Sequence, residues 1–331
     1  MELVYFVIYR HDNAFGNTAE QIICLAQELK RREEPDFTIL VEHEWQKTFC
    51  LLIPDVGEHQ VRVLGYELNA AAHENWVIEG YEKSQLKIPS YYSESGTDSY
   101  PCGWEQIESV NQPELFYNGT SSELQTDIVI QFRERGTWHR RVDGRYSEPQ
   151  RDVNPRKFKK LVLHLTKMGY SVGRIGDAEQ TPLPDLPNFI DFARNFEKDL
   201  NRDIRLINNC KLFISSDSAL WPLGIGLGKT TLITNVASVY PPMRTHRYVL
   251  SKIFFPTTGL LFKKSDVKPI KSSIFSWIAT NNSRVLYKNP LFINFFNRGV
   301  IYFRDNSYRD LVENSNQLLN LNHNSVEIKG R

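Results

Sequence analysis

Two short segments of the sequence carry residue types that hold a phosphorylated ligand. In the first, an apolar strand expected at 211–215 leads into Ser216, Asp217 and Ser218. Hydroxyl groups and the free backbone N–H groups of a helix start suit a diphosphate. In the second, Arg133 and Glu134 directly follow the apolar run 128–132, and arginine can grip a phosphate through two parallel hydrogen bonds. The alternatives are an ordinary helix cap and a solvated charged loop.

A third segment, Gly173–Asp177, ends another expected strand. Arg174 adds a cation there, Gly176 allows a ligand ring to approach closely, and Asp177 can accept a hydrogen bond from a ribose hydroxyl. A simple turn is the alternative interpretation. The negative charge of Asp217 in the first segment disfavours phosphate binding there, unless its carboxylate caps the helix or faces a sugar hydroxyl.

Alternating strands and amphipathic helices must position these segments. After Asp127 the sequence predicts strands at 128–132, 170–175, 189–192, 211–215 and 231–236, separated by helices with apolar residues at helical spacing. Such alternation predicts an α/β fold with a doubly wound parallel sheet. Because parallel strands end at the same edge of a sheet, we expect the three segments to converge on one crevice.

The chain start predicts a second parallel sheet. A strand at 3–9, a helix capped by Thr18 and a strand at 37–41 form a βαβ unit. Residues 92–126 are polar and read as a connection, with an ordered piece around Trp104. We therefore expect an N-terminal domain at 1–125 and a C-terminal domain at 126–320. The latter ends in a strand at 299–303 and a helix capped by Asp305, Asn306 or Ser307, and a frayed tail follows at 321–331.

The run 222–231, PLGIGLGKTT, imitates a phosphate-binding P-loop but does not fit it. Leu223 stands where the first glycine belongs, and a helix precedes the motif where a strand is required. The spacing of its glycines does not match a dinucleotide fingerprint either. We interpret the run as a closely packed helix that ends at a glycine.

Amino-acid composition argues against some kinds of binding partner. The chain has 331 residues, with 40 Lys and Arg against 39 Asp and Glu, a balance that argues against nucleic-acid binding. The basic cluster 156–160 reads as the solvated side of a helix. The sequence shows no signal peptide and no apolar run of membrane-spanning length. Its four separated cysteines predict reduced thiols and a cytoplasmic protein, and no zinc-ligand spacing or Asp-x-Asp pattern predicts a metal site.

Segments in a consistent order between about residue 14 and residue 315 resemble a family of bacterial glycosyltransferases met in surface-polysaccharide gene clusters. The segments are FGNTAEQ, VIQFRERG, RDVNPRKFKKLVLHLTKMGYSVGRIGD, PLPDLPNFIDFA, CKLFISSDSALWPLGIGLGKTTLITN, YVLSKIFF and GVIYFRDNSYRDLVE. The family is similar to the two-domain GT-B glycosyltransferases, in the style of heptosyl- and fucosyltransferases. The resemblance implies two Rossmann-like domains that face a cleft, with the acceptor on the N-terminal domain and the nucleotide sugar on the C-terminal domain.

The resemblance also implies roles for individual residues. Arg133 would neutralise the donor diphosphate, and Glu134, which follows it as in the family, would belong with Arg133 and Asp12 to the catalytic residues. The helix start at 216–218 would bind phosphate, and Gly176 and Asp177 would lie beside the nucleoside. Gly16 and Asn17 would form the N-domain loop that faces the donor. Two departures stand out, because Gln131 replaces a frequent histidine and Asp217 brings a charge to the usually uncharged helix start.

The function implied is transfer of a sugar from a nucleotide diphosphate sugar to a hydroxyl of a glycan or lipid-linked acceptor, without a cofactor or a required metal. The candidates for the base are Asp12, Glu20 and His139. A pyruvyltransferase of surface polysaccharides and a nucleotide-binding module without turnover are the alternatives. Peripheral contact with a membrane is a further expectation, for which the sequence offers aromatic residues near two lysines, Phe254, Phe255 and Trp277 near Lys263 and Lys264, although core packing explains most of them.

Overall fold

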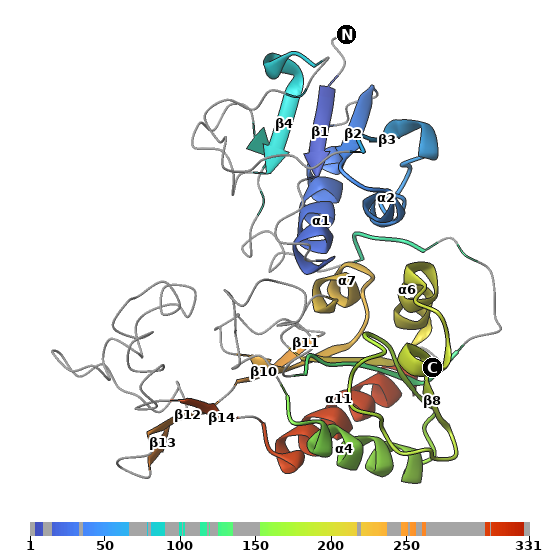
Figure 1. Ribbon diagram of the computed structural model, residues 1–331, viewed down its shortest axis with the longest axis vertical. Coiled ribbons are helices and arrows are strands. Elements are labelled where there is room, and N and C mark those ends of the chain that lie inside the picture. The colour runs from blue at the N-terminus through green and yellow to red at the C-terminus, as the bar shows by residue number, and fades with distance from the viewer. Residues whose placement is uncertain are drawn as a thin grey trace, which may run out of the picture. The chain divides into compact units, whose positions relative to one another are not determined.

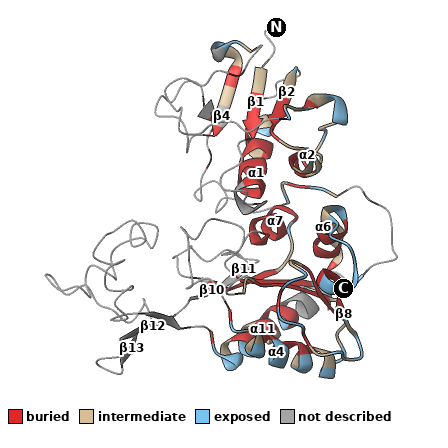
Figure 2. Cartoon of the chain, in the orientation of Figure 1, coloured by how far each residue is buried: buried red, intermediate tan, exposed pale blue. Residues whose placement is uncertain are grey.

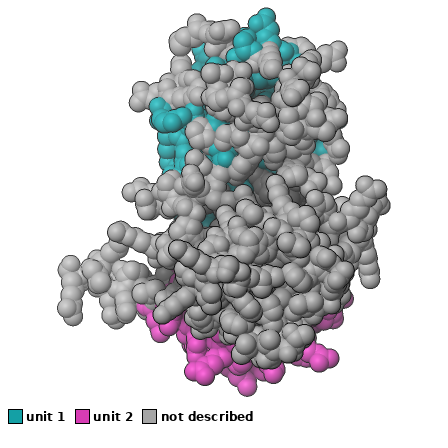
Figure 3. Space-filling model, turned by 90° about the vertical axis from the view of Figure 1, so that its left-hand side faces the viewer, with its two compact units in different colours: residues 1–125, 199–209, 219–229 teal, residues 126–198, 210–218, 230–331 magenta. Residues whose placement is uncertain are grey.

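The chain forms two compact units, which Figure 3 distinguishes by colour. Unit 1 comprises residues 1–125, 199–209 and 219–229, and unit 2 comprises residues 126–198, 210–218 and 230–331. The structure is a computed structural model, and it describes residues 4–8, 15–32, 36–65, 78, 81–89, 99–100, 102, 113–117, 119, 125–134, 153–216, 220–236, 246–250, 252–255, 260–262, 302–304 and 306–327.

Unit 1 contains a parallel sheet in the order β3-β2-β1-β4-β5 (Figure 1). The strands are β1 (Val4–Ile8), β2 (Phe37–Val41), β3 (Val61–Val63), β4 (Leu86–Pro89) and β5 (Ser99–Tyr100). Their helices are α1 (Phe15–Arg32), α2 (Glu44–Cys50), α6 (Leu200–Asn209) and α7 (Trp221–Gly226), with 3-10 turns at Glu58–Gln60 and Lys83–Gln85. The βαβ start predicted from the sequence is confirmed.

Two local predictions for unit 1 are wrong. The first helix begins at Phe15, so Thr18 lies inside it and does not cap it. The segment read as a connection contributes the strand β5, and the buried Tyr100 donates a hydrogen bond from its hydroxyl to the carbonyl of Val7 at 3.3 Å. That bond joins residues 93 positions apart, a contact that local composition does not reveal.

Unit 2 contains a second parallel sheet, in the order β11-β10-β9-β6-β7-β8. Its strands are β6 (Ile128–Gln131), β7 (Val172–Arg174), β8 (Phe189–Asp191), β9 (Leu212–Ser216), β10 (Thr231–Val236) and β11 (His246–Leu250). Counted along the chain within the unit and read from β8, this is the doubly wound order 3-2-1-4-5-6. The predicted α/β class with Rossmann-like units is therefore confirmed in each unit by itself. The strand order of unit 2 reverses between β6 and β9, which defines the switch point.

Helices α4 (Pro155–Lys167) and α11 (Tyr308–Glu327) lie side by side and pack on one face of this sheet (Figure 1). Asn154 caps α4 by accepting a hydrogen bond from the backbone of Arg156 at 3.0 Å. The buried side of α4 carries an apolar stripe every three to four residues, Phe158, Leu161, Val162 and Leu165. As predicted, the basic cluster occupies its solvated side, seen as pale blue in Figure 2.

The C-terminal region confirms one of the predicted helix caps and contradicts the predicted tail. Ser307 caps α11, because its hydroxyl accepts from the backbone of Asp310 while the Asp310 carboxylate accepts from the backbone of Ser307. The helix then continues to Glu327, so the tail predicted to fray from residue 321 is helical over most of its length. The last strand, β14 (Tyr302–Arg304), overlaps the predicted strand at 299–303, of which residues 299–301 lie outside the described residues. It pairs antiparallel with β12 (Lys252–Phe255), which also pairs with β13 (Leu260–Phe262).

Helix α7 confirms the rejection of a P-loop. All six of its residues are buried, and it precedes the strand β10. A Cβ atom on Gly226 would lie 2.7 Å from Leu115 Cδ1 and 2.9 Å from Ile23 Cγ1, which shows why glycine is needed for this packing. The described helix begins at Trp221 and not at Ser218 as predicted.

Candidate functional site

The switch point of unit 2 brings polar side chains together at the carboxyl ends of β6 and β9. Gln131 and Ser215 are direct neighbours across the two strands. The Ser215 hydroxyl donates a hydrogen bond to Gln131 Oε1 at 2.8 Å, and both residues are buried. In doubly wound sheets, ligands bind outside the strand ends at such a reversal of strand order.

Arg133 and Ser216 connect the first two predicted segments. The backbone N–H of Arg133 donates to Ser216 Oγ at 2.9 Å, across 83 positions of sequence. Ser216 is fully buried, whereas Arg133 is partly exposed just past the end of β6. The arginine predicted to hold a phosphate and the hydroxyl predicted to bind the same group thus lie at one place.

The third segment reaches the same edge through Gly176 and Gln180. Gly176 follows β7 with a φ of +128°, a backbone conformation that favours glycine. Gln180 is buried and donates from Nε2 to the carbonyl oxygen of Phe132, directly after β6. Its Oε1 has no hydrogen-bond partner among the described residues and lies 3.4 Å from where a Cβ of Gly176 would stand.

Arg174, predicted to contact the donor, serves instead as an internal anchor. Its side chain is fully buried, and its Nε and Nη2 engage the two carboxylate oxygens of Asp191 at 2.8 and 2.6 Å. Its Nη1 donates to the carbonyl of Thr181 at 2.7 Å. Burial lowers the pKa of Arg174, and the Asp191 carboxylate acts against that shift. The guanidinium therefore orders the loop after β7 and is not presented to a ligand.

The carboxylates of Glu134 and Asp177 also hold this loop. Glu134 accepts hydrogen bonds from the backbone N–H of Thr181 at 2.7 Å and from its hydroxyl. Asp177 accepts from the backbone of Glu179 at 3.1 Å, and Arg194 donates to the carbonyl oxygens at 178 and 180. These contacts give Glu134 and Asp177 a positioning role, and they fix the loop that carries Gly176 and Gln180.

Several predicted site residues are not placed at this edge. Asp12, His139, Asp217 and Ser218 lie outside the described residues, as do Trp277, Lys263 and Lys264. Gly16 and Asn17 lie in the first turn of α1. Glu20 is buried within α1, so it does not stand free beside a loop.

Gln180 is the residue that sequence reasoning missed. It stands in a polar turn, where glutamine is unremarkable, and its burial depends on the carbonyl of Phe132, 48 positions away. The only available signal was its position three residues after Asp177, where the segment assigned to the ligand edge ends.

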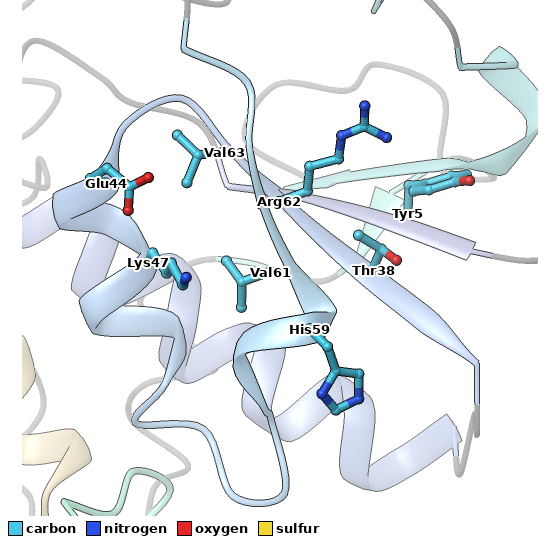
Figure 4. A pocket seen from close by; sticks show the side chains of 8 residues that line it. All are labelled: Tyr5, Thr38, Glu44, Lys47, His59, Val61, Arg62 and Val63. Carbon is cyan, nitrogen blue, oxygen red and sulfur yellow. The ribbon is translucent and has the colours of Figure 1, made fainter.

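Unit 1 shows a hollow along the edge strand β3 (Figure 4). Tyr5, Thr38 and residues of β3 line it, together with Glu44 and Lys47 of α2 and His59. Lys47 pairs with Glu58 at 3.3 Å. The hollow follows the length of an edge strand and does not collect the carboxyl ends of several strands, so it does not resemble the edge at β6 and β9.

The part of the chain that the structure describes contains neither a cluster of metal-ligating side chains nor a membrane-spanning helix. There, no three His, Cys, Asp or Glu side chains gather in a way that could hold a metal ion. No described helix combines the length and apolar character needed to cross a membrane. The four cysteines are buried, and none of them forms a disulfide.

Comparisons with known proteins found similarity at the level of solved structures. No family model and no curated protein sequence matches the chain. The ADP-heptose lipopolysaccharide heptosyltransferase II of E. coli is 14% identical with a TM-score of 0.46, over 75% of this chain and 90% of that one. A family 9 glycosyl transferase from Veillonella parvula DSM 2008 is 12% identical with a TM-score of 0.46, over 96% and 98%. The dodecameric glycosyltransferase TibC of E. coli is 14% identical with a TM-score of 0.41, over 90% and 76%.

Proposed function

We propose that this protein is a glycosyltransferase that binds a nucleotide diphosphate sugar at the carboxyl ends of β6 and β9. The observation that carries the proposal is the hydrogen bond between the Arg133 backbone and Ser216 at the switch point of a doubly wound sheet. It joins the two segments whose chemistry suits a diphosphate, in the place where such sheets bind ligands. The ordered segments that resemble a glycosyltransferase family supply the reaction class.

Sugar transfer from such a donor requires that the leaving nucleoside diphosphate be stabilised. As the glycosidic bond to phosphate breaks, negative charge grows on the diphosphate, and preorganised donors must meet it. The Arg133 guanidinium, the hydroxyls at 216 and 218 and the backbone N–H groups that follow β9 are the proposed donors. We propose metal-independent transfer, since the sequence lacks an Asp-x-Asp pattern and offers a cation and hydroxyls for the same task.

The nucleoside is proposed to lie over Gly176. A side chain at that position would crowd Gln180 Oε1, and glycine leaves the room open for a flat ring. The neighbouring carboxylate of Asp177 is the proposed acceptor for a ribose hydroxyl. No cofactor besides the nucleotide sugar is needed for this chemistry.

The acceptor is proposed to be a glycan or lipid-linked hydroxyl in the synthesis of a bacterial surface polysaccharide or glycolipid. In this proposal the N-terminal domain carries the acceptor, and Asp12 is the candidate base. The protein would work in the cytoplasm, and contact with the membrane would bring it to lipid-linked acceptors.

A nucleotide-binding module without turnover is the second candidate. It is favoured by one observation, the engagement of the Glu134 carboxylate with Thr181, which removes a predicted catalytic group from reacting atoms. A pyruvyltransferase is the enzyme alternative from the sequence.

Donor competition separates these candidates. The protein is incubated with nucleotide sugars or with phosphoenolpyruvate and a panel of soluble and lipid-linked glycan acceptors, and the release of nucleoside diphosphate or of phosphate is measured. A glycosyltransferase releases nucleoside diphosphate in an acceptor-dependent way, and Arg133→Ala abolishes the release. Nucleotide binding without any release assigns the chain to the module, and release of phosphate from phosphoenolpyruvate assigns it to the pyruvyltransferases.

A further inference from the structure

Helix α4 presents an unusual outer face in unit 2. Opposite its buried stripe, Arg156, Lys160, Leu163 and Lys167 follow one another at spacings of four, three and four residues, so they share one side of the helix. All four are exposed, and Lys159 stands beside them. We call these five residues the α4 face, and Figure 2 shows this side of the helix as solvent-exposed.

The charge of the α4 face is one-sided. No Asp or Glu occurs from Val153 to Gly176, although the whole chain has a formal net charge of only +1. The neighbouring helix α11 adds Arg309, which pairs with Glu313 at 2.6 Å, and Asp310. The acidic residues at the start of α11 therefore offset the charge of Arg309 on the same helix. Helix α4, in contrast, carries several cations and no acidic residue.

Apolar and aromatic side chains are exposed on the α4 face and next to it. Leu163 is 38% exposed, and Met168 at the end of the helix is 48% exposed. Tyr308, which is 37% exposed, lies edge-on against His164 of α4. Surfaces that bind a bilayer combine Lys and Arg with exposed apolar and aromatic side chains, whereas phosphate contacts of nucleic acids make no use of an exposed leucine.

We propose that the α4 face is a docking surface for an anionic lipid membrane. The lysines and the arginine would attract negatively charged headgroups, each contributing independently of the others. Leu163 and Met168 would enter the boundary between headgroups and acyl chains. This inference deepens the membrane contact named in the proposed function by assigning it to one surface, and it is tested separately from nucleotide binding, because docking requires neither a nucleotide nor turnover.

Vesicle binding by the full-length protein tests the inference. Sedimentation is compared for vesicles of phosphatidylcholine alone and for vesicles with about 30% phosphatidylglycerol, a density that gives an attractive surface potential. We expect binding only to the anionic vesicles, with a strong decrease as salt is raised from ~0.05 to ~0.5 M because screening shortens the reach of the charges.

Two variants locate the binding surface. The triple change Lys159→Gln, Lys160→Gln and Lys167→Gln is expected to weaken vesicle binding at least about tenfold. The matched control Lys30→Gln, Arg62→Gln and Lys198→Gln removes the same charge from exposed positions elsewhere and is expected to change vesicle binding less than about twofold. Leu163→Gln keeps every charge and is expected to weaken binding several-fold, with an unchanged circular dichroism spectrum as the folding check.

Three results would overturn the inference. These are no binding to anionic vesicles by the folded wild-type protein, equal losses in the test and control triples, and tighter binding to single-stranded RNA than to anionic vesicles. None of them bears on nucleotide binding, so a failure here is distinct from a failure of the proposed function.

Discussion

The backbone N–H of Arg133 donates a hydrogen bond to the buried hydroxyl of Ser216 at 2.9 Å, which ties the chain after β6 to the last residue of β9. Both residues stand at the point where the order of the sheet reverses. The contact sets where Arg133 leaves the sheet, and with it where its guanidinium can meet a ligand.

Removing that hydroxyl is expected to cost both stability and affinity. Ser216→Ala leaves the Arg133 N–H without its acceptor, and urea unfolding should show a loss of about 1–2 kcal/mol. Ser315→Ala is the control, because Ser315 is equally buried in α11 while its Oγ has no hydrogen-bond partner among the described residues. That variant should be neutral or more stable, since alanine favours a helix interior. Equal losses in the two variants would contradict a specific role for the Ser216 hydroxyl.

Gly176 provides a test of the ligand edge with a control of the same kind. Gly176→Ala strains a backbone with φ +128° and narrows the space beside Gln180, so it should lower stability by about 1–2 kcal/mol and also weaken nucleotide binding. Gly169→Ala introduces similar strain at φ +89°, with open space around its Cβ, at a position just before the amino end of β7 and not at the carboxyl ends of the strands. It should lower stability and leave affinity unchanged in a titration. Unchanged affinity in both variants would exclude a ligand over Gly176.

The buried pair of Arg174 and Asp191 predicts a large and non-additive loss. Asp191→Ala leaves a buried guanidinium without its carboxylate, which should cost about 3–5 kcal/mol in denaturant unfolding. Replacing both residues, as Arg174→Met with Asp191→Ala, should cost less than the sum of the single changes. Strict additivity in this double-mutant cycle would show that the pair is not coupled.

Asp127 predicts a pH dependence of stability at the amino edge of the sheet. Its carboxylate accepts hydrogen bonds from Ser171 and pairs with Lys211 at 2.8 Å. Partial burial acts against these contacts, but together they lower the pKa of Asp127. A lowered pKa in the folded state stabilises the protein above the unfolded value of about 3.9, and that contribution disappears as the pH falls through the folded value.

The corresponding variant is Asp127→Asn, measured by urea unfolding between neutral and acid pH. It should be less stable than the wild type by about 1–2 kcal/mol at neutral pH, and the difference should shrink below about pH 4. Asp185→Asn, at an exposed position, serves as the control with little change at any pH. A pH-independent difference for Asp127→Asn would show that its ionisation is not the cause.

The sheet of unit 2 could be predicted from sequence because its strands are compact apolar runs. The predicted strand 231–236 has the bounds of β10, and the predicted strand 211–215 differs from β9 by one residue at each end. The two-residue β5 could not be predicted, since its place in the sheet depends on contacts with β4 and on the bond from Tyr100 to Val7.

The site was predictable to the level of segments but not of roles. The sequence around an arginine at the end of a strand does not reveal whether its side chain faces a ligand or a buried carboxylate. The partner that decides the matter for Arg174, Asp191, lies 17 residues further on. Glu134 is a similar case, because its partner Thr181 belongs to a loop that comes close only once β6 and β7 have paired.

The central claim is that a nucleotide binds where β6 and β9 end, and calorimetric titration with ADP, GDP, UDP and CDP in the presence of EDTA tests it most directly. We predict binding of one nucleotide by the wild type. Affinity should fall at least about tenfold in Arg133→Ala, since a charge-assisted hydrogen bond is worth about 1.5–3 kcal/mol, and should be unchanged in Arg156→Ala, which removes the same charge from the exposed side of α4. Binding of none of the four nucleotides by the folded protein, or equal affinity in the wild type and Arg133→Ala, would contradict the account.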